Sequence, residues 1–214
     1  MISEKLTLLR ENFKNNASPE AKKIIMNSLN ELKTKKILET SLKIGDKIPN
    51  FTLSNSENIN INSDDLLSKG ELIINFYRGS WWPYCAIELG GFQDILTKIR
   101  SKGAEIIALS PELPEKSSVF KKKLSLDYEI LTDKNNEIAK AFGISFTLDD
   151  ELIELYKEFS IDLKISNGTN NWELPVPATY IISREGIILF SWLDLDYTKR
   201  VEPEDIYALL SDKN

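Results

Sequence analysis

Three compact apolar runs separated by helix-like segments dominate the middle of the chain. The runs are LIINF at 72–76, EIIALS at 105–110 and YEIL at 128–131, and the segments between them, 86–101 and 113–124, carry apolar residues at helical spacing. Parallel strands need a crossover helix between them, and helices then cover both faces of the sheet. The sequence therefore predicts an α/β domain with parallel strands at its centre.

The C-terminal third of the chain predicts strands that run antiparallel to the others. After a predicted short helix at 135–144, two further apolar runs at 178–183 and 186–193 are joined by the turn-like letters REG, which indicates a β-hairpin. A last helix is predicted at 202–211. The hairpin makes one edge of the sheet antiparallel. An insertion at about 146–176, with an amphipathic helix at 149–159 and a turn-rich loop, separates the two halves of the sheet.

The first 42 residues have no strand signal. Leu6, Leu9 and Phe13 recur at helical spacing, and Ser18 followed by Pro19 is typical of a helix start. We expect residues 1–42 to form a helical extension that packs either on the main domain or on a second subunit. The main domain is expected at 43–214. It begins with Gly45 and Pro49, which are typical of turns, followed by a predicted short strand near Phe51.

Charge and residue usage exclude several function classes. The net charge of −6 argues against a nucleic-acid binder, and no apolar run approaches the roughly 20 residues that span a membrane. The N-terminus resembles neither a signal peptide nor an anchor, so we expect a cytoplasmic location. The chain has no histidine and one cysteine. We therefore expect no metal, no cofactor and no intramolecular disulfide, and any redox partner must be another molecule.

The single cysteine, Cys85, ends the run FYRGSWWPYC at 76–85, between a predicted strand and a predicted helix. A helix that starts near Pro83 places the thiol in its first turn, where the helix dipole stabilises a thiolate, and Arg78 lies close enough along the chain to add to this. The alternative is that Cys85 is a small buried hydrophobe. Four aromatic residues either wall an apolar pocket around the thiol or serve only in packing: Trp81, Trp82, Tyr84 and Trp172.

The same run carries a family resemblance. It resembles F-Y-R-G-G-W-C-P-Y-C of the peroxiredoxin-like branch of the alkyl hydroperoxide reductase and thiol-specific antioxidant (AhpC/TSA) family, and the likeness continues in IGDKIPNFTL, IALSPELPEKS, LPVPATYIIS-REGII and DYTKRVEPEDI. The resemblance implies a thioredoxin-like fold, with a mixed central sheet flanked by helices. Trp82 replaces the first cysteine of the C-P-Y-C pair. Against the peroxiredoxin pattern P-x-x-x-T-x-x-C, Cys85 holds the peroxide-attacking position, Arg78 replaces the proline and Trp82 the threonine.

The resemblance also suggests roles for individual residues. Cys85 would be the nucleophile, and Arg78 its activating cation because no arginine lies near Pro177. Pro177, which precedes Ala178 and Thr179, matches the cis-proline position of thioredoxin-like proteins; the sequence alone instead favours a trans proline at the start of a strand. Glu88 matches an acidic residue common after the peroxide-attacking cysteine, but we favour an ordinary solvated or N-terminal-turn carboxylate. The expected catalytic residues are Cys85 and Arg78, and the expected pocket residues are Trp81, Trp82, Tyr84, Glu88, Pro177 and Thr179.

The resemblance implies a thiol peroxidase that reduces hydroperoxides through one cysteine. An external thiol, either a thioredoxin-like protein or a low-molecular-weight thiol, would regenerate Cys85. An alternative is a catalytically degenerate thioredoxin-fold protein that binds a ligand or a protein partner. A homodimer linked through Cys85 is a third hypothesis, and it ranks last because the cysteine is expected in a recessed loop.

Overall fold

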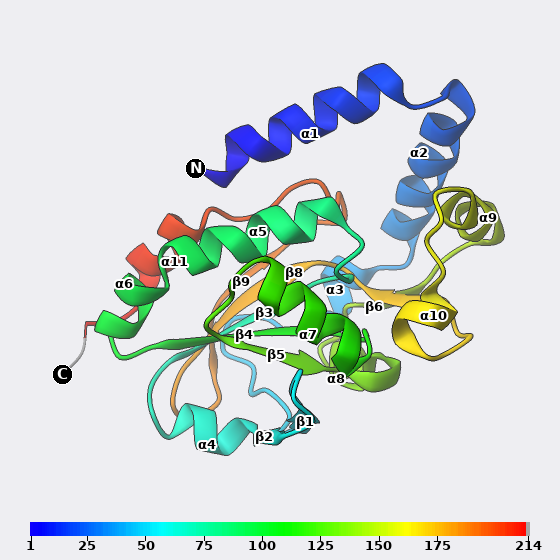
Figure 1. The fold of residues 1–214 in the computed structure, drawn as a ribbon. Helices are drawn as coiled ribbons and strands as arrows, with labels where there is room; N and C mark the ends of the chain where they lie inside the picture. Colours follow the sequence, from blue (N-terminus) through cyan, green and yellow to red (C-terminus); the bar gives the residue numbers. More distant parts are fainter. Residues whose placement is uncertain (213–214) are drawn as a thin grey trace.

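A five-stranded mixed sheet forms the centre of the computed structural model, which describes residues 1–212 (Figure 1). The strands are β3 (Leu72–Phe76), β4 (Glu105–Ser110), β5 (Glu129–Thr132), β8 (Ala178–Ile182) and β9 (Ile188–Leu193), in the order β5-β4-β3-β8-β9. β3, β4 and β5 are parallel, whereas β8 pairs antiparallel with β3 and β9 antiparallel with β8. The predicted mixed α/β fold is confirmed.

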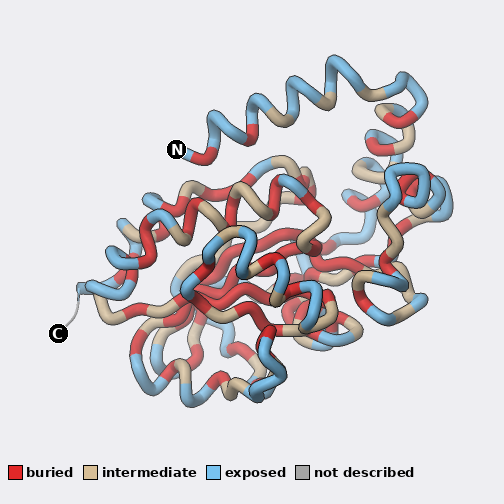
Figure 2. Tube along the Cα trace, in the orientation of Figure 1, coloured by how far each residue is buried: buried red, intermediate tan, exposed pale blue. Residues whose placement is uncertain are grey.

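Helices pack around this sheet: β3, β4 and β8 are buried almost throughout, whereas in the edge strand β9 only Ile188 is buried (Figure 2). The helices that follow the strands are α5 (Pro83–Asp94), α6 (Leu96–Ser101), α7 (Pro114–Lys123), α8 (Glu137–Ala141) and α11 (Pro203–Leu209). The helix predicted at 86–101 is divided in two at Ile95. The helix predicted at 135–144 is shorter than expected because Asn135 and Asn136 adopt left-handed backbone angles, leaving a 3-10 turn (Lys134–Asn136) before α8.

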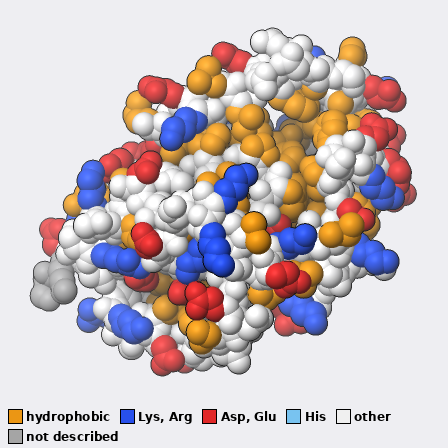
Figure 3. Space-filling view, viewed as in Figure 1, with side chains coloured by type: hydrophobic (Ala, Val, Ile, Leu, Met, Phe, Trp, Pro, Cys, Tyr) orange, Lys and Arg blue, Asp and Glu red, His pale blue; other side chains and the backbone are white. Residues whose placement is uncertain are grey.

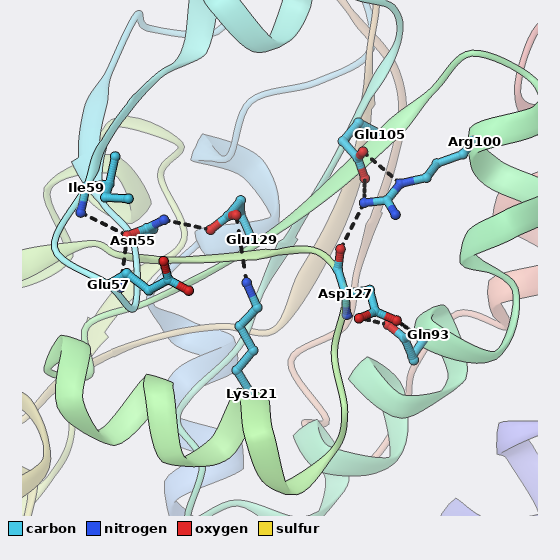
Figure 4. A network of polar contacts seen from close by, with 9 residues as sticks. All are labelled: Asn55, Glu57, Ile59, Gln93, Arg100, Glu105, Lys121, Asp127 and Glu129. Carbon is cyan, nitrogen blue, oxygen red and sulfur yellow. Dashed lines mark hydrogen bonds and ion pairs between the residues drawn. The ribbon is translucent and has the colours of Figure 1, made fainter.

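One predicted strand and two small elements that the sequence did not predict lie beside the sheet. The expected short strand, β1 (Thr52–Ser54), pairs with β2 (Asn60–Asn62), and a short helix, α4 (Ser63–Leu67), follows. Figure 4 shows two groups of polar contacts on this side of the sheet: Asn55 Nδ2, just after β1, donates to Glu129 Oε2 of β5 over 3.0 Å, and Arg100 of α6 pairs with Glu105 of β4 over 2.9 Å. These contacts lie at the β5 side of the sheet, away from the single cysteine.

The segment between α8 and β8 is closed by its own two-stranded sheet. β6 (Ser145–Thr147) pairs antiparallel with β7 (Glu173–Pro175), and the chain between them forms α9 (Asp150–Glu158) and α10 (Leu163–Asn167). α9 matches the predicted amphipathic helix. α10 and β7 lie partly in the stretch predicted as a turn-rich loop.

Two long helices and a short one precede the sheet. α1 (Ile2–Asn16) contacts α5, α2 (Pro19–Thr34) contacts α9, and α3 (Ile37–Thr40) leads into the first strand (Figure 1). Ser18 caps α2, because its Oγ accepts the backbone N–H of Ala21 over 3.1 Å. The N-terminal helices therefore pack against the same chain. Within residues 1–212, no helix combines the length and apolar character needed to cross a membrane.

Candidate active site

The strand-to-helix junction after β3 places Cys85 in the first turn of α5. Trp82 precedes the helix, Pro83 is its first residue, and the Cys85 N–H donates to the Trp82 carbonyl over 3.0 Å. Gly79 allows the loop to turn: its φ is +156°, and a Cβ there would lie 2.2 Å from Trp81 Nε1. The Cys85 side chain is completely buried.

An arginine from a distant part of the chain reaches the thiol. Arg200 Nη2 lies 3.7 Å from Cys85 Sγ, and Arg200 Nε donates to Glu88 Oε2 over 2.7 Å. Arg200 lies between β9 and α11, 115 residues from the cysteine. Arg78 was predicted as the best substitute for the missing activating arginine, but the guanidinium that contacts the sulphur is that of Arg200. Arg200 lies in DYTKRVEPEDI, a stretch that the resemblance had already singled out.

Arg200 and Glu88 belong to a buried polar network. Arg200 Nη1 donates to the carbonyls of Tyr197 and Lys199, and Thr179 Oγ1 donates to Glu88 Oε1 over 3.5 Å. Glu88 is 1% exposed. Our preferred interpretation of Glu88 as a solvated or N-terminal-turn carboxylate is wrong, because Glu88 lies beyond the first turn of α5 and its side chain points inward beside Cys85.

Burial sets the protonation of this site. It raises the pKa of the Cys85 thiol, and Arg200 and the backbone N–H of Arg78 oppose this only in part. Burial likewise raises the pKa of Glu88 against the lowering effect of Arg200. The Arg200 pKa is raised, because Glu88 and Cys85 outweigh the lowering effect of burial. The expectation of a thiolate already stabilised by the helix start therefore does not hold for this closed arrangement.

The Arg78 guanidinium has other partners. Its Nη1 donates to Tyr156 Oη over 3.0 Å, and its Cζ lies 4.5 Å from the ring centroid of Tyr197, 5.4 Å from that of Phe146 and 5.7 Å from that of Trp82. The Arg78 side chain is thus surrounded by aromatic rings, and its guanidinium makes no hydrogen bond to Cys85.

Those rings form a continuous aromatic cluster beside the thiol. The Trp82 ring centroid lies 5.4 Å from that of Trp81, 5.0 Å from that of Tyr197 and 6.1 Å from that of Tyr84. Trp172 has no ring contact with this cluster and lies instead 5.7 Å from Lys157 Nζ. Trp82 aligns with the threonine of the P-x-x-x-T-x-x-C pattern, so this position carries an indole ring in place of a hydroxyl group.

Two further residues differ from expectation or were missed. Pro177 is not preceded by a cis bond, because residues 1–212 contain no cis peptide, so the cis-proline interpretation is wrong. Glu112, which sequence reasoning did not identify, holds the loop before α5: its carboxylate accepts the Ser80 N–H over 2.8 Å and the Ser80 hydroxyl over 2.7 Å. Glu112 lies in IALSPELPEKS, one of the stretches that carry the resemblance, but no local pattern predicts its contact with Ser80 across 32 residues. Across residues 1–212, no group of three His, Cys, Asp or Glu side chains is arranged to hold a metal ion.

Comparison with known proteins gives the same family throughout. A family model described as the AhpC/TSA family matches residues 44–191. The putative peroxiredoxin bcp of Buchnera aphidicola subsp. Schizaphis graminum is 33% identical over 105 residues, which are 49% of this chain and 66% of that protein. The corresponding match to the Coxiella burnetii protein is 31% over 104 residues, 49% of this chain and 68% of that protein. This chain thus matches about two thirds of each relative's length.

Solved structures show the same fold. Peroxidoxin BcpB from Mycobacterium tuberculosis superposes with a TM-score of 0.62 at 20% identity, covering 79% of this chain and 96% of that one. Peroxiredoxin Q of Xanthomonas campestris superposes with a TM-score of 0.58 at 18% identity, covering 75% and 89%. A thioredoxin-like sheet with a buried cysteine at this helix start defines a peroxiredoxin-like protein. The chain belongs to the AhpC/TSA family.

Proposed function

We propose that this protein is a one-cysteine thiol peroxidase that reduces hydroperoxides. The observation that carries the proposal is the contact of Arg200 with Cys85 Sγ and with Glu88. A guanidinium at that place stabilises the thiolate and donates a hydrogen bond to the peroxide oxygen that gains negative charge as the O–O bond breaks. Glu88 keeps the guanidinium oriented toward the sulphur. The peroxiredoxin relatives support the same chemistry.

The reaction balances with two equivalents of an external thiol. The Cys85 thiol releases its proton, and the thiolate attacks one oxygen of ROOH as the O–O bond breaks. The departing RO⁻ takes up a proton and leaves as ROH, and Cys85 becomes a sulfenic acid. A first thiol, R′SH, attacks that sulphur and releases water, leaving a mixed disulfide on Cys85. A second R′SH then releases R′SSR′ and restores the Cys85 thiol. An external thiol is needed because the chain has one cysteine.

Peroxide reaches this thiol only if the site opens. Cys85 is completely buried, and Trp82 and Tyr84 in the loop and first turn of α5 are nearly so. We include in the proposal a local opening at Trp82 that exposes the sulphur to peroxide and then to the reducing thiol. Opening also removes the burial that raises the Cys85 pKa.

The test is a peroxide titration with mass detection of Cys85–SOH. The natural protein should gain one oxygen atom per chain and consume peroxide catalytically when a thiol such as dithiothreitol or thioredoxin is supplied. The Cys85→Ser variant should do neither, and Arg184→Met, which changes an exposed arginine of the hairpin turn, should behave as the natural protein. Equal peroxide consumption by the natural protein and Cys85→Ser would exclude the proposal.

One observation favours a second candidate function. The complete burial of Cys85 and its raised pKa suit a family member that keeps the fold, has lost catalysis and binds a ligand or partner. Slow alkylation of Cys85 at neutral pH, together with no sulfenic acid after peroxide treatment, would support this alternative. The cytoplasmic location and a homodimer remain predictions.

A further inference from the structure

Glu112 is a buried carboxylate that forms no ion pair within residues 1–212. It is 1% exposed, and its two oxygens accept the N–H and the hydroxyl of Ser80 over 2.8 Å and 2.7 Å. A buried charge is costly unless hydrogen bonds or an opposite charge compensate it. For this carboxylate, both hydrogen bonds come from one residue, and that residue belongs to the loop at 79–82 that leads into α5.

The backbone of Glu112 is fixed by the ends of two central strands. Glu112 lies between β4 and α7, its carbonyl accepts the hydroxyl of Thr132 over 2.9 Å, and its N–H donates to Ser110 Oγ over 3.3 Å. Thr132 and Ser110 are the last residues of β5 and β4. The contact between Glu112 and Ser80 therefore joins the loop to a fixed point at the carboxyl edge of the parallel strands.

In the described part of the chain, the loop has no other hydrogen bond to a neighbouring element. Its remaining backbone bonds run within the loop or into α5, and the buried indole N–H groups of Trp81 and Trp82 donate to no acceptor there. Its other contacts are apolar. Both indole rings pack on Tyr156, with centroids 5.7 Å and 5.8 Å apart, and hydrophobic side chains gather in a hollow beside the N-terminal helices, where α5 begins (Figure 3). Aromatic contacts allow several geometries, whereas a hydrogen bond depends on direction, so Glu112 defines the position of the loop.

We propose that Glu112 is a positioning residue of the reaction, because its contact with Ser80 holds the loop closed over Cys85 and the release of this contact admits peroxide and the reducing thiol. Trp82 belongs to the loop and directly precedes α5, so a shift of the loop moves the indole away from the helix turn that carries the sulphur. Glu112 acts through Ser80 and not on the sulphur itself. The inference rests on the opening included in the proposed function, and it assigns the residue that controls that opening.

The test compares alkylation of Cys85 by iodoacetamide in native full-length variants, so that its outcome does not depend on peroxidase activity. Glu112→Leu leaves both donors of Ser80 without their acceptor and should accelerate alkylation about tenfold or more. Glu112→Gln keeps an acceptor for the Ser80 N–H and should change the rate by less than about threefold. Urea denaturation gives the global unfolding equilibrium of each variant. Alkylation of Glu112→Leu that is no faster than that of the natural protein, or that global unfolding fully accounts for, would overturn the proposal.

The chain contains a matched control for this contact. Glu71 accepts the N–H of Ser211 over 3.0 Å and its hydroxyl over 2.7 Å, the same pair of bonds at the opposite end of β3. Glu71→Leu should leave the alkylation of Cys85 unchanged. If Glu112→Leu folds poorly, Ser80→Ala removes one of the two bonds and should accelerate alkylation about threefold, whereas Ser80→Thr keeps the hydroxyl and should not. Equal rates for the two Ser80 variants would also overturn the proposal.

A peroxide titration of the same variants separates this inference from the proposed function. If Glu112→Leu accelerates both alkylation and the formation of Cys85–SOH, both proposals are supported. Faster alkylation of Glu112→Leu, with no sulfenic acid in any variant or in the natural protein, would support the control of access by Glu112 and exclude the peroxidase.

Discussion

At the residue scale, the two arginines near Cys85 have separate tasks. Arg200 contacts the sulphur and is oriented by Glu88, whereas the Arg78 side chain faces aromatic rings and donates to Tyr156. This division follows from partners rather than from distance along the sequence, since Arg78 is the nearer of the two in the chain. The reactivity of Cys85 should therefore depend on Arg200.

Arg200→Met should reduce both reactivity and stability. Loss of a donor at the developing charge should slow sulfenic acid formation about 10²-fold. Because Glu88 is left buried without its partner, the free energy of unfolding should fall by about 3–5 kcal/mol, measured by urea denaturation. Adding Glu88→Leu should recover much of that stability but not the rate. A double variant that regains the rate would contradict the assigned role of Arg200.

The pH dependence of Cys85 should reveal its burial. Because burial raises the thiol pKa, the rate of alkylation by iodoacetamide should climb with pH through 7–9, without a plateau below pH 9. Stability changes in the opposite direction: because the native thiol pKa is raised, its contribution to stability is present below the unfolded pKa of about 8.5 and is lost as pH rises through the native value. The urea-unfolded protein is the control. A native plateau below pH 8 would show a stabilised thiolate instead.

At the scale of elements, α1 is attached to the loop that carries Arg200. Glu202 accepts the backbone N–H of Ile2 over 3.0 Å and that of Ser3 over 2.6 Å, at the start of α1. At Gly91 of α5, a Cβ would lie 2.5 Å from the Ile2 side chain, so the two helices approach closely. The first turn of α1 is thus held by a carboxylate two residues after Arg200, which complements the helix dipole.

Acid should release this attachment. Burial alone would raise the Glu202 pKa, but hydrogen bonds from Ser3 and Ile2 lower it. A lowered native pKa gives a contribution that is present above the unfolded pKa of about 4.3 and lost as pH falls through the native value. Amide hydrogen exchange, corrected for intrinsic rates, should therefore show reduced protection of the first turn of α1 below pH 4. Glu202→Gln should reduce that protection at neutral pH too, and unchanged protection in this variant would contradict the attachment.

At the scale of the whole molecule, the fold encloses its one thiol. β3, α5 and the segment after β9 surround Cys85 completely, and aromatic side chains cover the helix start. This enclosure is the reason why both peroxide and the reducing thiol require an opening movement. It also bears on the hypothesis of a dimer linked through Cys85.

Diamide should cross-link native chains slowly and unfolded chains readily. Two buried thiols cannot approach to the roughly 2.0 Å of a disulfide while both chains keep the closed fold. Non-reducing electrophoresis should therefore show monomer after brief treatment of the native protein, and dimer after the same treatment in urea. The Cys85→Ser variant should remain monomeric in both. Rapid native cross-linking would indicate an exposed thiol and would favour a disulfide-linked dimer.

The sequence by itself determined the order of the five central strands and of the helices between them, and the place of Cys85 at a strand-to-helix junction. Apolar runs such as 72–76 and 105–110 can be buried only in a covered sheet, and Pro83 after the loop marks the start of α5. Both signals are local, because they depend on residue type and short spacing. The family resemblance in 76–85 is local as well.

Only the tertiary structure decided which charged groups meet the thiol. Arg200 reaches Cys85 across 115 residues, Glu88 turns inward to meet it, and Arg78 faces Tyr156 from the insertion. No spacing rule predicts these contacts, because the packing of β9, α5 and α9 brings the side chains together. The raised pKa of Cys85 also arises from that packing, since burial of the whole site outweighs the local helix start.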